Sequence, residues 1–534
     1  MKIKIYFSVL ILVISSQCFA QTVFEKKHKI TTPQSMTGRC VVQNIYSDFF
    51  EHGSQYTDFF SGTSQLYIAK FSNAGTLKWN RNYYNTSVGN ITLHAKGMVA
   101  LNDGGVIISG FVLSPDSVTD YDIMVARLDS SGAVMWSKMI GDSISHTDNE
   151  GAIGIIETTD GNFVISGTTR VPLPNADFYA KITPSGTILW QKRFMVAQQT
   201  EGCKNLVATP GGGFAIGGDK LMIIKFDTNG NQLWKTVPNF PTGKAARATT
   251  ICKTNDGGYA VAGVAGESNN GNVINDSRDI SIAKYDSIGN LQWVKKYISP
   301  KQDYPASIFQ NPNGNFVIGG THGSLNVGTE YATLLLTDVA GNSISAKQGP
   351  VHQSSFYSML KCSDGGYIFS GNSTNDTTTS RFPITIKTDS SFSLPCFSPY
   401  TFIDSAYSIT ATYSGVFSLT NTNYQSRNFI LVHTDSNTVS NYCATLDLNT
   451  LYDENAIALY PNPAVNDITL LLPGGQLPVS YTVYDIFGKT IYSKKLPAGT
   501  TKEWIDVSGF SGGIYFIGLK LGNKKSVSRK FVVM

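Results

Sequence analysis

The stretch Thr254–Val264, TNDGGYAVAGV, decides the fold, because the chain repeats it. Close versions begin at Leu101, Thr158, Thr209, Asn311 and Cys362: LNDGGVIISGF, TTDGNFVISGT, TPGGGFAIGGD, NPNGNFVIGGT and CSDGGYIFSGN. Each is a tight turn followed by the period-two alternation of a β-strand with one buried face. Gly at the corner adopts a positive φ without a Cβ clash, and the Asp or Asn beside it accepts hydrogen bonds from the turn backbone.

The repeated unit is longer than this motif. A second strand and turn follow, as in DISIAKYDSIGN from Asp279, and then a third strand with Trp at a fixed place. These tryptophans are Trp79, Trp136, Trp190, Trp234 and Trp293. Because the residues before each DGG also alternate, one unit is four short strands joined by hairpin turns. No segment has a sustained 3.6-residue period with caps, so we expect essentially no helix.

The spacing of the units predicts how they assemble. The turn glycines from Gly104 to Gly365 are 57, 51, 45, 57 and 51 residues apart. A four-stranded unit at this period is typical of a β-propeller blade, and a ring of blades covers the faces that a single blade leaves exposed. The expected fold class is therefore all-β, a β-propeller of four-stranded blades followed by a small Ig-like β-sandwich.

Two partial units flank the six clear ones and leave the blade count open. Residues 64–83 have the later half of a unit, and residues 406–421 have the earlier half, followed by a third strand, NFILVHTDS. If the two ends share one blade, the ring has seven blades. If each end forms its own blade, the ring has eight. We favour seven.

The N-terminus, MKIKIYFSVLILVISSQCFA, is typical of a signal peptide. Lys2 and Lys4 precede an apolar run too short to span a bilayer, and small residues precede a predicted cut between Ala20 and Gln21. The alternative is a lipoprotein signal with Cys18 as the lipidated residue. Nothing else in the sequence is long and apolar enough for a transmembrane helix, so we expect an exported chain with no transmembrane segment.

Composition narrows the partner classes. Charged residues make up 15% of the chain, aromatics 11%, and there are 50 glycines, which is typical of an all-β protein with many tight turns. The formal net charge of +4 is small for 534 residues, and there is no block of like charge. We therefore expect no nucleic acid partner and no binding to a charged membrane surface.

Export makes disulfides chemically accessible, and Cys396 and Cys443 flank the last repeat unit, so we predict a bridge between them. Cys203, Cys252 and Cys362 each precede the Asp position of the repeated turn by an even number of residues, so we expect them on one face of equivalent strands, as small buried hydrophobic residues. No Cys/His spacing fits a metal site.

Residues of the repeat also resemble a known class. The pattern DGG-Y-x-x-x-G followed by K-x-D-x-x-G-x-x-x-W resembles secreted bacterial β-propellers, over about residues 35–435. This resemblance implies an architecture but no activity, because propellers carry many unrelated functions.

The tail is more specific. Its residues resemble the type A C-terminal sorting domain of the type IX (Por) secretion system through four motifs: LYPNP with Tyr460, Pro461, Asn462 and Pro463; VYDIFGK with Asp485, Gly488 and Lys489; GGIYFI with Gly513 and Tyr515; and KSVSRKFVVM with Lys530. The resemblance implies the type IX machinery as partner. It also implies a Gram-negative source, and a secreted or outer-membrane surface location reached via the periplasm.

The expected domains are a signal peptide at 1–20, a β-propeller at 21–445, a linker at 446–457 and the sorting domain at 458–534.

Candidate chemistry is sparse. The seven histidines show no local pairing and are interpreted as surface or loop residues: His28, His52, His94, His146, His322, His352 and His433. Ser143, in GDSISHTDNE, resembles an esterase nucleophile block, but equivalent loops lack it, so we interpret it as a loop residue. We predict no catalytic, cofactor-binding or metal residues and no cofactor. Calcium at DTNGN (Asp227–Asn231) or DSIGN (Asp286–Asn290) is the alternative, although turn capping accounts for both. The repeated tryptophans are predicted to pack between blades rather than to form a sugar platform.

Three functions are compatible with this sequence. The first, which we favour, is a secreted or cell-surface non-catalytic propeller that binds a glycan or protein partner through loops such as Ala265–Asp279. The second is an extracellular hydrolase or lyase with its site in the propeller channel. The third is a structural component of the envelope or matrix. The sequence leans away from an enzyme without naming the ligand.

Overall fold

The computed structural model divides the chain into two compact units, residues 1–441 and 442–534. In the first, the structure describes residues 23–29, 36–56, 64–85, 93–113, 121–141, 151–169, 176–194, 206–269, 272–273, 278–324, 329–349, 354–375, 378–392, 398–400, 402–407, 410–414, 420–421, 425–428, 431–435 and 438–441. In the second, it describes residues 458–472, 478–497, 500, 502–521 and 526–534. Among these residues, the one helical element is a single 3₁₀ turn, η1 (Pro210–Gly212). None of the described helical segments has the length and hydrophobicity to span a bilayer.

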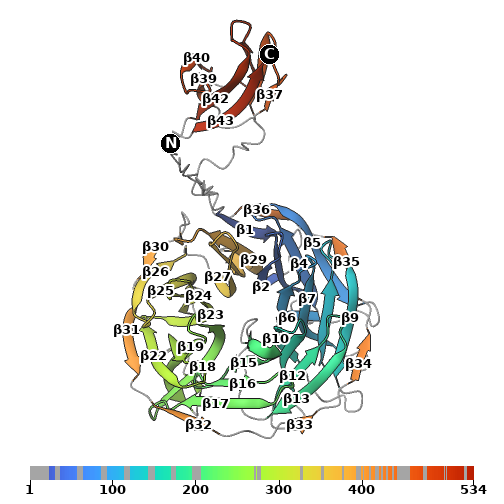
Figure 1. Ribbon diagram of the computed structural model, residues 1–534, viewed down its shortest axis with the longest axis vertical. Helices are drawn as coiled ribbons and strands as arrows, with labels where there is room; N and C mark the ends of the chain where they lie inside the picture. The colour runs from blue at the N-terminus through green and yellow to red at the C-terminus, as the bar shows by residue number, and fades with distance from the viewer. Residues whose placement is uncertain are drawn as a thin grey trace, which may run out of the picture. The chain divides into compact units, whose positions relative to one another are not determined.

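The first unit is a ring of seven antiparallel sheets around a central opening (Figure 1). Blades 1 to 3 are β2 (Met36–Gln43), β3 (Phe49–Tyr56), β4 (Ser64–Phe71) and β5 (Leu77–Asn85); β6 (Leu93–Ala100), β7 (Val106–Leu113), β8 (Tyr121–Leu128) and β9 (Val134–Gly141); and β10 (Gly151–Glu157), β11 (Phe163–Thr169), β12 (Ala176–Ile182) and β13 (Ile188–Phe194).

Blades 4 to 7 continue around the ring: β14 (Leu206–Ala208), β15 (Phe214–Gly217), β16 (Ile223–Phe226) and β17 (Gln232–Pro238); β18 (Lys244–Lys253), β19 (Tyr259–Asn269), β21 (Asp279–Tyr285) and β22 (Leu291–Ile298), with β20 (Asn272–Val273) paired to β19; β23 (Gln302–Gln310), β24 (Phe316–Ser324), β25 (Thr329–Thr337) and β26 (Ser343–Gln348); and β27 (Ser354–Lys361), β28 (Tyr367–Asn375), β29 (Thr378–Thr388) and β1 (Phe24–Lys29). The predicted all-β propeller and the favoured count of seven blades are confirmed.

Blade 1 is complete, although the sequence showed only its later half. Strands β2 and β3 are joined by the turn Asn44–Asp48, which lacks the DGG motif. Ser47, at the position of the corner glycine, adopts the same left-handed backbone, with φ at 63°. A non-glycine residue at this corner therefore concealed the first blade.

The ring closes in blade 7, where the N-terminal strand β1 pairs with β29 as the fourth strand. The two ends of the propeller do share a blade, but through β1 and not through residues 64–83 and 406–435 as the sequence suggested. Phe24 of β1 packs against the blade 1 turn, where a Cβ on Gly75 would lie 2.6 Å from its ring. Closure therefore joins β1 to a strand more than 350 residues later in the chain.

A further segment surrounds the ring. Seven short strands between residues 398 and 441, here called the belt, each add a fifth strand to the outer edge of one blade (Figure 1). In order, they cover blades 6, 5, 4, 3, 2, 1 and 7: β30 (Ser398–Tyr400), β31 (Ile403–Tyr407), β32 (Ala411–Ser414), β33 (Thr420–Asn421), β34 (Gln425–Asn428), β35 (Leu431–Asp435) and β36 (Thr438–Asn441). The prediction that residues 406–421 begin a blade is wrong, because the described strands of this range are belt strands on three different blades.

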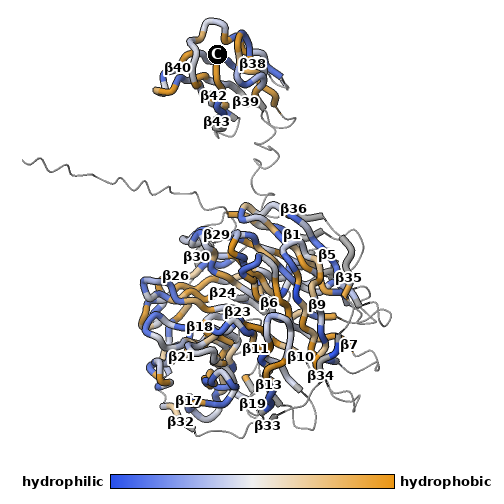
Figure 2. The backbone as a smooth tube through the Cα atoms, turned by 45° about the vertical axis from the view of Figure 1, so that its right-hand side comes forward, coloured by the Kyte–Doolittle hydropathy of each residue, from blue (hydrophilic) through white to orange (hydrophobic). Residues whose placement is uncertain are grey.

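The hydrophobic core is divided among the junctions between blades. One cluster joins blades 1 and 2 through residues such as Phe50 and Ile108, and another joins blades 5 and 6 through residues such as Ile282 and Ile318. Hydrophobic segments, orange in Figure 2, run through the blade strands. Because each blade presents both faces to its neighbours, no single blade could bury this surface alone.

The repeated tryptophans pack between blades, as predicted. Each ring lies against the second turn of the next blade, where glycine leaves room for it. A Cβ on Gly230 would lie 2.7 Å from the Trp190 ring, and one on Gly289 would lie 2.8 Å from Trp234. Blade 6 has Ser345 at the Trp position, and there the next turn carries Phe392 instead of glycine, with φ at 58°. At this junction the large side chain therefore comes from the turn of blade 7 instead of the fourth strand of blade 6.

The second unit contains a three-stranded and a four-stranded sheet, in the orders β37-β38-β41 and β40-β39-β42-β43. Their bounds are β37 (Ala458–Tyr460), β38 (Asp467–Leu471), β39 (Pro478–Asp485), β40 (Thr490–Lys495), β41 (Lys502–Asp506), β42 (Gly513–Leu521) and β43 (Ser526–Val533). One core joins side chains from both sheets, including Ile468, Val483 and Phe531. The unit is thus a small β-sandwich, as predicted.

Two histidines contradict the prediction that all seven are surface or loop residues. His322 is 2% exposed, and its Nδ1 shares a hydrogen bond with the Asp303 carboxyl at 2.7 Å. His52 on β3 is fully buried, and within the described residues neither ring nitrogen has a hydrogen-bond partner. Burial, with smaller contributions from Arg39 and Lys96, lowers the pKa of His52 to about 3.

This burial predicts acid lability. In the unfolded chain a histidine titrates at about 6.5, so as pH falls below that value the unfolded state gains a proton that native His52 does not accept. Stability is therefore lost as pH falls from about 6.5 towards 3. We expect His52→Leu to lose less stability than the wild type, by about 2 kcal/mol, between pH 6.5 and 5. Denaturant unfolding at both pH values measures this, and equal losses would contradict it.

Candidate functional site

The sorting motifs that the sequence singled out meet in the second unit. Asn462, which follows β37, accepts a hydrogen bond from the Val532 amide at 2.9 Å and reaches the Lys530 carbonyl at 3.4 Å. The first and last motifs are therefore joined, with Tyr460, Pro461 and Pro463 exposed around that contact and Lys530 also exposed.

The two middle motifs have structural roles. Asp485 accepts hydrogen bonds from the Phe487 and Lys489 amides at 2.9 and 3.0 Å, and Gly488 adopts φ of 79° in the same turn. Gly513 begins β42, and Tyr515 lies in the core, where its ring stacks on Phe531 with centroids 5.7 Å apart. Phe487, at the tip of this hairpin, is 88% exposed.

Other predicted positions lie outside the described residues: Ala20, Gln21, Ser143, Cys203, Cys396 and Cys443. Cys252 and Cys362 are buried, as predicted, but only Cys252 lies in a strand, because Cys362 begins the turn that follows β27.

The two candidate calcium loops act as turns. The Asp227 carboxylate accepts hydrogen bonds from the Asn229 and Asn231 amides at 2.9 and 2.8 Å, and Asp286 repeats the arrangement. These oxygens therefore already serve the turn backbone. In the described part of the chain, no group of three or more His, Cys, Asp and Glu side chains is placed to hold a metal ion.

Ser299, which follows β22 of blade 5, forms a polar group with Asp303 and His322 of blade 6; Asp303 and His322 are buried and Ser299 is partly buried. Ser299 donates to Asp303 at 2.8 Å, and Ser299 and Asp303 both face the same ring nitrogen of His322, Nδ1. Burial, more than the opposing hydrogen bond from His322, raises the pKa of Asp303 to about 6. A nucleophilic triad needs serine and carboxylate on opposite ring nitrogens, so this arrangement fastens two strands and does not activate Ser299.

A structural pair that the sequence reading missed recurs in the first turn of the blades. In blade 5, Asp256 accepts the Gly258 amide at 3.0 Å through one oxygen and Lys284 Nζ at 2.7 Å through the other. Asp103–Arg127, Asp160–Lys181 and Asp364–Lys387 repeat it. The DGG aspartate thus also neutralises a cation on the third strand, and the K of the repeat is its partner.

Blade 6 lacks both members of this pair, with Asn313 at the aspartate position and Leu336 at the lysine position. Asn313 keeps the turn role by accepting the Asn315 amide at 3.1 Å. In blade 6, neutral residues therefore occupy both the carboxylate position and the cation position of the pair.

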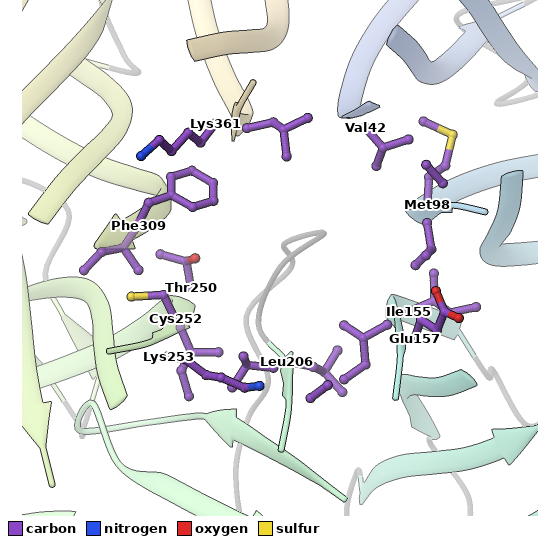
Figure 3. Close-up of a pocket in the computed structure, with 18 of the residues that line it drawn as sticks. Val42, Met98, Ile155, Glu157, Leu206, Thr250, Cys252, Lys253, Phe309 and Lys361 are labelled. Atoms are coloured by element: carbon purple, nitrogen blue, oxygen red, sulfur yellow. The ribbon is translucent and has the colours of Figure 1, made fainter. Parts of the chain in front are cut away.

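The central channel is the candidate binding site. It encloses about 610 Å³ at the end of the ring where the first turns lie, and the first strand of every blade lines it (Figure 3). Equivalent positions from the seven repeats form two rings of side chains. One residue before the turn lies the mouth ring: Gln43, Ala100, Glu157, Ala208, Lys253, Gln310 and Lys361.

Two residues before the turn lies the apolar ring: Val42, Val99, Ile156, Val207, Cys252, Phe309 and Leu360. All seven members are apolar, and Val99, Ile156, Val207, Phe309 and Leu360 remain partly exposed to the channel. Aligning the seven first strands shows that this position is always apolar. The sequence alone does not distinguish a channel wall from a buried core, because both place apolar residues at alternate strand positions.

Among the described residues that line the channel, all charged side chains belong to the mouth ring. Lys361 donates to the Asn311 side chain at 2.8 Å, Lys253 is exposed, and Glu157 is exposed on blade 3. Partial burial raises the pKa of Glu157. Among the described residues that line this cavity, Glu157 is the one carboxylate, and the two lysines lie on other blades.

Residues 458–534 match the family model described as a secretion system C-terminal sorting domain. No curated protein matches the chain.

Solved structures similar to this chain include a polysaccharide lyase, at 11% identity and a TM-score of 0.42, covering 68% of this chain and 99% of that one. A Penicillium chrysogenum α-L-arabinanase in complex with arabinobiose has 10% identity and a TM-score of 0.39, covering 70% and 99%. A Fusarium graminearum α-L-arabinofuranosidase with an iminosugar inhibitor has 11% identity and a TM-score of 0.38, covering 69% and 98%. At these identities and TM-scores the likeness establishes no shared chemistry.

Proposed function

We propose that this chain, which its C-terminal domain directs through the type IX secretion system to the cell surface or extracellular space, is a non-catalytic propeller that binds a partner in its central channel. The observation that carries this proposal is the apolar ring, in which all seven blades contribute an apolar side chain at one position. A preformed cavity of about 610 Å³, mostly apolar with a few polar groups at its mouth, has the character of a ligand site.

The channel composition favours binding over glycoside cleavage. Hydrolysis of a glycosidic bond ordinarily uses two carboxylates flanking the bond, and Glu157 is the one carboxylate among the described lining residues. A rigid ring with an apolar wall instead supplies contact area at little ordering cost, because the seven strands are already fixed by their sheets.

The test separates this proposal from the alternative of a hydrolase or lyase in the channel. The purified mature protein and Glu157→Gln are incubated with a panel of bacterial and plant polysaccharides, and reducing ends and unsaturated uronates are measured. We expect no release above the buffer blank from either protein, and binding to whole cells by both. Turnover that is present in the wild type and lost in Glu157→Gln would overturn the proposal in favour of the enzyme.

The export route has its own test. Deleting Ser526–Met534 is expected to retain the protein in the periplasm, but this deletion also removes Phe531 and Val533 from the domain core. Phe487→Ser is a sharper variant, because the exposed ring at the hairpin tip is a natural contact for the secretion machinery. We expect a several-fold lower secreted fraction with an unchanged melting temperature, and normal secretion of Phe487→Tyr. Full secretion of Phe487→Ser would contradict this contact.

A further inference from the structure

We propose that the channel takes the aliphatic chain of a single-chain acidic amphiphile, with the chain against the apolar ring and the acid group at the mouth beside Lys253. This assignment rests on the proposed function, because it names the ligand class of the same channel.

The apolar ring selects for an aliphatic ligand. Its exposed members are mainly aliphatic side chains in contact with the channel: Val99, Ile156, Val207 and Leu360, with Phe309 as the one aromatic. Covering this surface with methylene groups removes apolar area from water on both sides of the contact, at about 25 cal/mol for each Å² buried. A sugar would place hydroxyl groups against the same wall, where the described side chains outside the mouth ring offer only the Thr250 hydroxyl and the Cys252 thiol as partners, and an unpaired hydroxyl is costly.

The arrangement of the strands selects for a linear chain. The lining comes from the first strands of all seven blades, which surround the channel on every side (Figure 3). A flexible chain can bend to lie against successive members of the ring, whereas a flat rigid ligand contacts only part of it. The rigid sheets cannot close around a small ligand, so contact area depends on filling the ring.

The mouth ring selects for an acid. Two lysines and one glutamate give this ring a formal charge of +1. Lys361 is engaged by Asn311, and Glu157 lies on blade 3, away from Lys253 on blade 5. An exposed ammonium at the end of an apolar channel attracts a carboxylate and repels a cationic head group.

The experiment uses the mature full-length protein and three ten-carbon probes: decanoate, decanol and decyltrimethylammonium, each below its micelle concentration, in titration calorimetry. We expect decanoate to bind most tightly and the ammonium most weakly. Val207→Glu, which places a charge in the apolar ring, should weaken decanoate at least about ten-fold. Val207→Thr, nearly the same shape, tests the same wall if the glutamate variant fails to fold, and should weaken it about three-fold. Lys253→Gln should lower decanoate affinity to that of decanol and leave decanol unchanged.

Val339→Glu is the matched control, because Val339 is 59% exposed and outside the channel lining. It should leave all three affinities unchanged. The aliphatic assignment is overturned if decanoate does not bind, or if it binds equally to the wild type and both Val207 variants. Whole-cell binding distinguishes this failure from that of the proposed function: its loss in folded Val207→Glu keeps the channel as the site for another ligand, and its persistence there removes the channel altogether.

Discussion

A chain that ends at Phe392, without the belt, is expected to aggregate and to melt about 10 °C or more below one that ends at Asn441. The belt supplies the fifth strand of every blade, so its removal takes several backbone hydrogen bonds from each of seven sheets. It also exposes seven outer edges, each a row of unpaired amides and carbonyls available to another chain. The loss is larger than for one missing strand because it affects the whole circumference.

The chain ending at Asn441 is the matched control, since residues 1–441 form one compact unit and both chains lack the sorting domain. Size-exclusion chromatography measures association and differential scanning calorimetry measures the melting temperature. If the chain ending at Phe392 runs as a monomer and melts at the same temperature as the control, the belt does not stabilise the propeller.

The sequence predicted the propeller because its information is local and repeated. Six turns with glycine corners and five tryptophans identified the blades. Each of these features has the same structural role in every copy of the repeat. The belt escaped because its strands are two to five residues long and each lies on a different blade. A strand such as Thr420–Asn421 has no alternation to detect, and pairing with β13, more than 220 residues away, is determined by tertiary context alone.

The candidate sites also divide into those that contiguous motifs reveal and those that only the folded ring brings together. Tyr460 and Lys530 were identified because the four sorting motifs are contiguous stretches with distinctive residues. The apolar ring is built from one residue in each of seven repeats, and a single Val207 or Leu360 looks like any buried strand residue. Only the closure of the ring turns that position into the wall of a channel. Sequence reasoning also gave the DGG aspartate one role, in the turn, and missed its lysine partner because the two belong to different strands.

That pair leads to the second large effect. Asp256→Asn is expected to destabilise the propeller by about 3 kcal/mol, because it leaves the Lys284 ammonium buried without a counter-ion. The Lys284 side chain is 4% exposed, whereas Asp256 is 52% exposed, so the reverse change, Lys284→Leu, leaves a carboxylate that water can still reach. Lys284→Leu should therefore cost less, about 1 kcal/mol. The asymmetry follows from burial and not from the strength of the contact.

The double variant Asp256→Asn with Lys284→Leu copies blade 6, where Asn313 and Leu336 already occupy these positions. Since neither charge remains, we expect it to recover more than half of the loss in Asp256→Asn, giving a coupling energy of about 2.5 kcal/mol or more in a double-mutant cycle. Asp286→Asn is the matched control, because Asp286 caps the second turn of the same blade with no lysine contact among its turn hydrogen bonds. Additive losses would show that the pair is not coupled.

The same pair has a pH signature. Burial opposes ionisation of Asp256, but hydrogen bonds from Lys284, Thr254 and the Gly258 amide outweigh it and lower the pKa to about 2. Because this value is below that of the unfolded chain, about 3.9, the stabilisation is present above pH 4 and is lost as pH falls towards 2. The stability difference between the wild type and Asp256→Asn should therefore shrink over that interval, as measured by denaturant unfolding. A difference that stays constant from pH 6 to pH 2 would mean that the carboxylate charge contributes nothing, and that the aspartate stabilises the blade through its turn hydrogen bonds alone.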